Sequence, residues 1–532
     1  AKRSGVLRNL LSGKRRDVVF LSATPVNNSL WDLYHILGFF LKHDATLSDL
    51  GIRSIRSRFN QAMGEDPFNL NPDLLYQVID ATTVKRTRKF VTSHYQNDTI
   101  PGPDGKPVPI RFPKPHAITI KYQLEEILPG FFENFAEILM PEIGPPQLKM
   151  ARYKPEMYPK GKDPQTDDSP VVGLLRSIML KRFESSAYAF VNTIGKMIKQ
   201  HEAFLSALDD GKVIIKEFFK EWAASDQEDF EQLLRISEHT ESIDAYNLEA
   251  LKRDVENDLE ILKGFHADVK KIDHGNSPKL DALIKEIIAI EKDAEKSGLD
   301  REDIDQKRKI LIFSFYEDTV DWIEEHLVKA IKKDKRLHSY KKRLASVSGK
   351  QSRNGIKKID AIHGFAPLST KAPAILDKDK FDILISTDVL AEGMNLQQCG
   401  NVINFDLPWN PMKLVQRHGR IDRIGSNYKD VYMRSFFPDD KLDALLKLEN
   451  RIREKLAQAA ASVGVEDSPI EFGSHREATF SDTDDEIKKL YKGDASIYEE
   501  GGTKGAAQTG EEYRQELRKA IKKYGDELAE MP

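Results

Sequence analysis

Short apolar runs alternate with helical patterns between residues 279 and 436. The runs that predict strands are 310–315, 381–386, 402–405 and 431–436, and amphipathic segments separate them. Because strands that alternate with helices form parallel sheets covered on both faces, this stretch predicts an α/β fold.

The residues before this stretch predict two further regions. The run 18–21 has the composition of a buried strand, and apolar residues at helical spacing follow it up to residue 41. Prolines crowd the segment 101–115, which predicts a linker or a long hairpin. Apolar residues at three and four spacing then predict a helical region over 124–267, interrupted at 141–170.

Composition restricts the class of protein. The chain has 532 residues, enough for about three to four domains. Its one cysteine, Cys399, cannot form an intrachain disulfide, and its apolar stretches fall far short of the ~20 residues of a membrane span. We therefore expect a cytoplasmic protein without membrane contact. The net charge of −4 means that nucleic acid would have to be bound by local basic clusters.

The segment STDVLAEGMNL, residues 386–396, directly follows a predicted strand. Ligands of α/β proteins bind at the carboxyl ends of parallel strands. Thr387 can hold a phosphate, Gly393 lets a backbone N–H approach one, and Asn395 can bond a ribose. The alternative is a strand-to-helix turn capped by Asp388.

The segment QRHGRIDRIG, residues 416–425, places Gln416, Arg420 and Arg423 at spacings of four and three, on one face of a helix. Two converging guanidiniums suit a transferring phosphoryl group, whose oxygens share the developing charge. The alternative is a solvated face, or structural ion pairs with Asp422.

Five segments together resemble the motifs of superfamily-two helicase-like ATPases of the Swi/Snf type, in the order that the family shows. They are SATPVNN (22–28), VKRTRK (84–89), ILIFSFYEDTVDWIEEHL (310–327), STDVLAEGMNLQ (386–397) and FDLPWNP with QRHGRIDRIGS (405–426). In the helical middle, KRFESSAYAF (181–190) is similar to a segment of bacterial members.

The resemblance implies roles for individual residues. Arg420 and Arg423 would be arginine fingers on ATP, and Gln416 would sense its γ-phosphate. The remaining implied roles are nucleotide binding by Gly393, Asn395 and Gly419, contact with a DNA phosphate by Thr387, and coupling of the ATP state to DNA binding by Ser22 and Thr24. The basic cluster that contains Arg86 is expected either to follow a phosphate backbone or to be a short solvated run. The histidines show no spacing typical of a metal site.

One departure from the family concerns the phosphate-binding loop. No Gly-Lys-Ser/Thr occurs in the chain, and no Asp-Glu box precedes Ser22. In the family these motifs hold the phosphates and Mg²⁺. We therefore expect the sequence to start inside the first of two RecA-like lobes, so that ATP and Mg²⁺ would be held mainly by residues that it lacks and this chain alone would be inactive.

The resemblance implies an α/β fold of RecA-like lobes with a helical insertion. The predicted ranges are 1–120 for the partial first lobe, 121–278 for the helical insertion, 279–440 for the complete second lobe and 441–532 for a helical, partly flexible extension.

The implied function is that of an ATP-dependent translocase on duplex DNA, with RNA as an open alternative. A DNA-bound complex such as RNA polymerase is one partner that the sequence leaves open. A non-hydrolysing docking or nucleic-acid-binding subunit is a second interpretation, motivated by the missing phosphate-binding loop. A strand-separating helicase is a third.

Overall fold

The computed structural model describes residues 2–11, 17–21, 30–64, 73–84, 91, 95, 98–101, 107–139, 146–162, 170–216, 238–348, 351–352, 356–374, 378–390, 394–408, 411–424 and 426–437. The extension predicted for 441–532 lies outside them.

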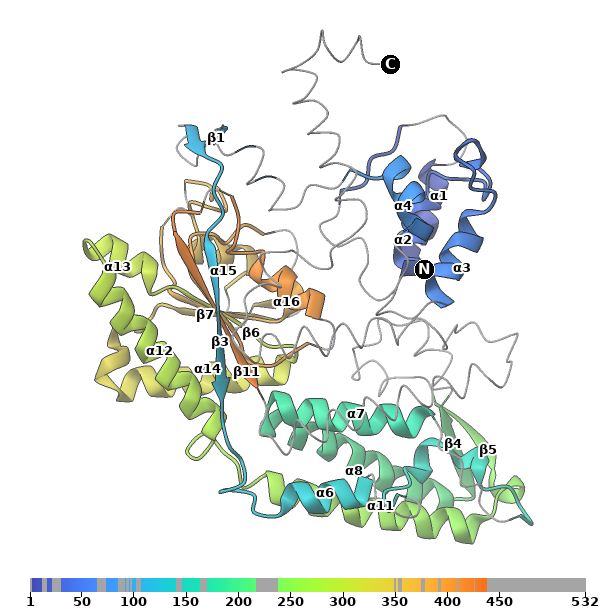
Figure 1. Ribbon diagram of the computed structural model, residues 1–532. Helices are drawn as coiled ribbons and strands as arrows, with labels where there is room; N and C mark the ends of the chain where they lie inside the picture. The colour runs from blue at the N-terminus through green and yellow to red at the C-terminus, as the bar shows by residue number, and fades with distance from the viewer. Residues whose placement is uncertain are drawn as a thin grey trace.

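A seven-stranded sheet organises the larger part of the described chain (Figure 1). In spatial order its strands are β3 (Lys114–Lys121), β11 (Asp430–Phe437), β10 (Asn401–Asn404), β6 (Ile310–Phe313), β9 (Ile383–Ser386), β7 (Leu344–Ser348) and β8 (Gln351–Ser352). Only the pair β7 and β8 is antiparallel. The predicted α/β fold and the four strands expected after residue 279 are confirmed.

Helices cover both faces of this sheet. They are α12 (Pro278–Ser297) and α14 (Glu317–Lys333) on one face, and α15 (Lys358–Phe365) and α16 (Pro411–His418) on the other; α13 (Arg301–Lys307) precedes β6. Along β6, Ile310 and Ile312 share a core with α12 and α14, whereas Leu311 and Phe313 share one with α15 and α16. This alternation follows from the two-residue period of a strand.

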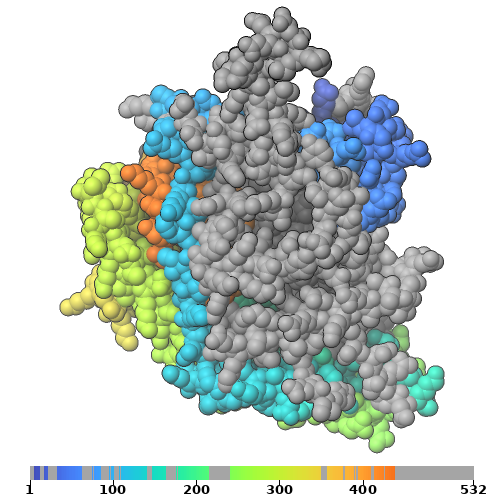
Figure 2. Space-filling model, in the orientation of Figure 1, coloured from blue at the N-terminus to red at the C-terminus, as the bar shows by residue number. Residues whose placement is uncertain are grey.

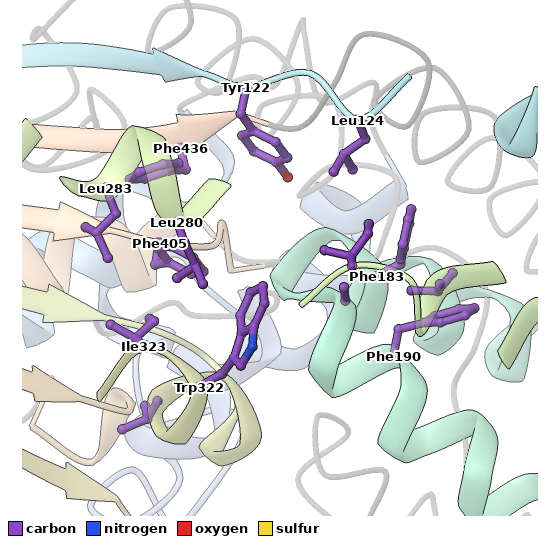
Figure 3. Close-up of a cluster of buried hydrophobic side chains, with 14 of the residues drawn as sticks. Tyr122, Leu124, Phe183, Phe190, Leu280, Leu283, Trp322, Ile323, Phe405 and Phe436 are labelled. Atoms are coloured by element: carbon purple, nitrogen blue, oxygen red, sulfur yellow. The ribbon is translucent and has the colours of Figure 1, made fainter. Parts of the chain in front are cut away.

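The helical unit lies below the sheet in Figure 1. We use this name for α6 (Phe131–Leu139), α7 (Pro170–Ser185), α8 (Ala187–Asp209), α11 (Leu248–Val269) and the antiparallel strands β4 (Lys212–Lys216) and β5 (Glu238–Ser242). Its aromatic residues Phe183 and Phe190 belong to the same buried cluster as Phe405 and Phe436 of the sheet (Figure 3). The helical unit and the sheet therefore share one hydrophobic core.

The N-terminal helices are α1 (Lys2–Leu11), α2 (Leu30–Leu37), α3 (Ile55–Gly64) and α4 (Asp73–Thr82), and the last three share a separate core. The strand expected at 18–21 is wrong. Residues 17–21 are irregular, and Val19 and Leu21 are 82% and 94% exposed. A strand needs a neighbour for its backbone groups, and the described residues offer this run none.

The proline-rich segment forms a short antiparallel hairpin of β1 (Thr99–Pro101) and β2 (Pro107–Pro109), one of the two predicted forms. All but the last residue of the next strand, β3, lies inside the range predicted for the first lobe, yet the strand pairs along its whole length with β11. As an edge strand β3 accommodates Pro115, which has no N–H to donate. Its residues (cyan) form a column on the surface beside α12 and α13 (Figure 2).

Lys279, at the start of α12, joins the helical unit to the sheet. Its buried Nζ donates to the carbonyl oxygens of Glu184 (2.6 Å) and Ser185 (3.0 Å) at the end of α7. The same Nζ lies 4.4 Å from the centre of the Phe405 ring and 5.2 Å from that of Tyr122. Burial lowers the pKa of Lys279 to about 8.

We expect the wild-type protein to gain stability, relative to a Lys279→Met variant, as the pH rises from about 8 to 10. The folded protein loses the lysine proton near pH 8, whereas the unfolded chain keeps it up to the ordinary pKa of 10.5. Between these values the unfolded state binds more protons, so a rising pH favours folding, by up to about 3 kcal/mol.

The measurement is urea unfolding of both proteins at several pH values, with Lys252→Met as the matched control. Lys252 is an exposed lysine paired with Asp209, and its variant should follow the wild type between pH 8 and 10. A Lys279→Met difference that stays constant with pH would contradict the buried charge.

Candidate functional site

The two candidate segments of the sequence meet at the carboxyl edge of the sheet. We call them the fifth-motif loop (387–396, after β9) and the sixth-motif segment (416–424, from α16 onward). The backbone N–H of Leu396 donates to the carbonyl oxygen of Arg420 at 2.9 Å. The parallel arrangement of β9 and its neighbours places this contact where α/β proteins bind ligands.

Arg420 and Arg423 both reach the end of the fifth-motif loop. Arg420 Nη1 donates to the carbonyl oxygen of Met394 at 3.2 Å, and its Nε to that of Gln416 at 3.1 Å. Arg423 Nη1 donates to Asn395 Oδ1, and its Nε to the carbonyl oxygen of Gly419 at 2.6 Å. The two guanidiniums thus bind consecutive residues of one loop, which brings the two residues predicted as arginine fingers together with Asn395.

Burial lowers the pKa of Arg423, so its charge is less stable than that of a free arginine. An anion beside it would offset that cost. A cation held at a partly desolvated edge is therefore suited to a negatively charged ligand.

Gly419 directly follows the last residue of α16, where there is little space for a side chain. Its N–H donates to the carbonyl oxygen of Val415 at 2.8 Å, and a Cβ added to it would lie 3.2 Å from that same oxygen. The glycine lets the chain turn from α16 toward Arg420 without crowding. Its predicted role in nucleotide binding stays a prediction.

Arg417, the buried arginine of the sixth-motif segment, was not among the residues predicted for the site. Arg417 forms a two-bond ion pair with Asp388, with Nε to Oδ1 at 2.5 Å and Nη2 to Oδ2 at 3.1 Å. Burial alone would lower the pKa of Arg417. The charge of the Asp388 carboxylate and its hydrogen bonds have the larger, opposite effect, so the pKa of Arg417 is raised. Asp388 starts a short 3₁₀ turn next to Thr387, which is itself largely buried.

Asp406, which follows β10, was also missed. Its Oδ2 accepts from the hydroxyls of Ser185 and Ser314, each at 2.6 Å, and its Oδ1 accepts from the N–H of Phe315 at 2.8 Å. Its backbone carbonyl oxygen accepts from Arg417 Nη1 at 3.1 Å. The signal in the sequence was an acidic residue directly after a buried strand.

Several predicted site residues cannot be placed. Ser22, Thr24, Arg86 and Gly393 lie outside the described residues. Within the described ranges, acidic, histidine and cysteine side chains form no group of three or more that could hold a metal ion. The same ranges contain no helix that is both long and apolar enough to cross a bilayer.

Comparison with known proteins matches residues 279–425 to the model of the helicase conserved C-terminal domain. The matched part of the chain is similar to this domain. The match contains β6, β9, β10, α16 and both segments of the site. The match supports the resemblance to superfamily-two helicase-like proteins, whereas the residue roles stay predictions.

Three relatives show how far the similarity extends. The chain is 44% identical over 80 residues to an uncharacterized ATP-dependent helicase, YqhH, of Bacillus subtilis, 15% of this chain and 14% of that protein. It is 38% identical over 82 residues to the ATP-dependent RNA helicase eIF4A of Candida glabrata, 15% of this chain and 20% of that one. It is 36% identical over 70 residues to the RNA polymerase-associated protein RapA of Yersinia pestis, 13% of this chain and 7% of RapA. The chain thus spans at most a fifth of the length of these relatives.

A solved structure of the C-terminal part of the Fun30 ATPase domain aligns with 66% of this chain and 99% of its own, at 17% identity. Its TM-score of 0.33 is too low to bear on the fold.

We expect Arg417→Ala to lower the free energy of unfolding by about 3–5 kcal/mol, because it leaves the Asp388 carboxylate without its buried partner. Arg423→Ala should cost less than about 1 kcal/mol, since Arg423 is only partly buried. Chemical denaturation of the two variants measures both values. Equal losses would contradict the division between a structural and a ligand-binding arginine.

Proposed function

We propose that this chain is part of an ATP-dependent motor that translocates on duplex nucleic acid. The observation that carries the proposal is the convergence of Arg420 and Arg423 on the fifth-motif loop. Two guanidiniums beside a loop at the carboxyl edge of a parallel sheet are suited to the γ-phosphate of ATP.

The residues described here fit the phosphates of ATP better than they fit its metal. Arg420 and Arg423 would stabilise negative charge as the γ-phosphate leaves, and Asn395, which now binds Arg423, would be released toward the nucleotide. Mg²⁺ prefers carboxylate oxygens and water as ligands. The described residues contain no group of three or more acidic, histidine or cysteine side chains that could hold it. We therefore assign phosphate contacts, and no metal ligand, to the described residues.

Nucleic acid would be contacted through Thr387, whose backbone is fixed at the end of β9 beside the Arg417–Asp388 pair. ATP binding would draw another lobe against the arginines, and hydrolysis would release it. Repeated closure and opening would move the motor along one strand.

A second candidate is a docking subunit that hydrolyses no ATP. The absence of any Gly-Lys-Ser/Thr in the 532 residues favours it. It predicts that duplex binding by this chain is unaffected by ATP and by substitution of Arg420 or Arg423.

We expect Arg420→Ala, in the polypeptide as its source cell makes it, to reduce DNA-stimulated ATP turnover by about 10³-fold or more, as for other arginine fingers. The circular dichroism spectrum should not change. Arg336→Ala, which removes an exposed arginine paired with Asp334, is the matched control and should retain full turnover. Turnover of Arg420→Ala within about twofold of the wild type would rule out the assigned role.

A further inference from the structure

We propose that the last turn of α7, together with Ser186, which joins it to α8, is a positioning element for the arginines of the sixth-motif segment. We call residues 181–186 (KRFESS) the junction turn. The inference deepens the proposed ATPase function and rests on it: the helical unit would set the place of the catalytic arginines instead of merely covering one end of the sheet.

Side chains of the junction turn form hydrogen bonds with the backbone that follows β10. Glu184 Oε1 accepts from the N–H of Leu407 at 3.1 Å, and Lys181 Nζ donates to the carbonyl oxygen of Leu407 at 3.2 Å. Lys181 and Glu184 also form an ion pair at 2.8 Å. Both polar backbone groups of Leu407 are thus held by side chains of the junction turn, just before α16 begins at Pro411.

Asp406 connects the junction turn to the sixth-motif segment by hydrogen bonds. Its carboxylate accepts from Ser185 of the junction turn, and its backbone carbonyl oxygen accepts from Arg417 of the sixth-motif segment. Arg417 in turn pairs with Asp388 of the fifth-motif loop. A continuous series of hydrogen bonds with charged partners therefore leads from the helical unit to both motifs that surround Arg420 and Arg423.

The polar contact between the junction turn and the residues after β10 is buried. Glu184, Ser185 and Asp406 are each no more than 2% exposed. Apolar contact alone would tolerate small shifts, and the shared aromatic core already supplies it. Buried polar groups accept few geometries, because a displaced group loses its hydrogen-bond partner and has no water to replace it. The junction turn thus fixes the register of the loop that leads into α16.

A fourth contact fixes the other side of the junction turn. Arg182 Nη1 pairs with Asp318 Oδ2 at 2.9 Å, and its guanidinium lies 4.1 Å from the centre of the Tyr316 ring. The hydroxyls of Ser185 and Ser186 bond Thr319 Oγ1 at 2.7 and 2.8 Å. The start of α14 and the loop after β10 are therefore bound to the same six residues.

The test uses Glu184→Ala in the native polypeptide, with Glu184→Gln as the conservative variant and Ser185→Ala as a milder one. We expect Glu184→Ala to lower kcat for ATP hydrolysis by about 10- to 100-fold, the effect of a small misplacement of catalytic groups. The KM for ATP should stay within about twofold. Glu184→Gln keeps an acceptor for the Leu407 N–H and should recover part of kcat.

The matched control is Asp209→Ala, which removes the exposed ion pair with Lys252 between α8 and α11 of the same helical unit. It should leave kcat unchanged. Kinetic values are compared per folded molecule, so that a loss of stability alone does not count as support.

Amide hydrogen exchange on this chain gives a readout that needs no activity. In Glu184→Ala and Ser185→Ala, exchange should rise over 404–408 and 411–424 and stay unchanged in β7. Exchange that rises only in α7 and α8, or a kcat of Glu184→Ala within twofold of the wild type, would overturn the proposal. If the wild-type polypeptide hydrolyses no ATP, the proposed function fails, and hydrogen exchange still decides whether the junction turn positions the sixth-motif segment.

Discussion

The arrangement of this protein depends on the burial of compensating charges at the carboxyl edge of its sheet. Glu184 pairs with Lys181, and Arg417 pairs with Asp388 and lies 3.9 Å from the Asp406 carboxylate. The ammonium of Lys279 is held by the backbone carbonyl oxygens of Glu184 and Ser185. A buried charge without a partner would destabilise the fold by several kcal/mol, so each member constrains where the others lie. The charge of Lys279 is costly to bury, because its ammonium lies among aromatic rings and contacts two carbonyl oxygens. Burial therefore lowers its pKa to about 8.

This cluster makes one body of two regions that are far apart in the sequence. The helical unit contributes Lys181 and Glu184, and the stretch 279–425, which matches the helicase C-terminal model, contributes the remaining four charged residues. The aromatic core supplies the apolar contact between them (Figure 3), and the charges fix its register. As a result, Arg420 and Arg423 emerge from a segment whose base, Arg417, is held on both sides.

The sequence predicted β6, β9, β10 and β11, because each coincides with a short, largely apolar run, but it did not predict β3, β7 or β8. It also predicted that residues 386–396 and 416–425 belong to one site, and the two segments do meet. It could not show that Arg417, and not its neighbours, forms the structural pair, since three arginines within seven residues look alike until burial separates them. The strand expected at 18–21 failed because an apolar run becomes a strand only beside a partner. The addition of β3 to the edge of the sheet depends on a contact more than 300 residues away along the chain, with Asp430 to Phe437, which no local pattern encodes.

The central claim is that Arg420 and Arg423 are held ready for a phosphate while Arg417 stays structural. A structure of the native polypeptide with ADP and a fluoroaluminate analogue of the transferring phosphoryl group tests it most directly. The account predicts both guanidiniums within hydrogen-bond distance of the fluoroaluminate, moved from Met394 and Asn395, with Arg417 still paired to Asp388. Arg420 and Arg423 unmoved from that loop with the nucleotide bound, or Arg417 turned toward the phosphate, would contradict it.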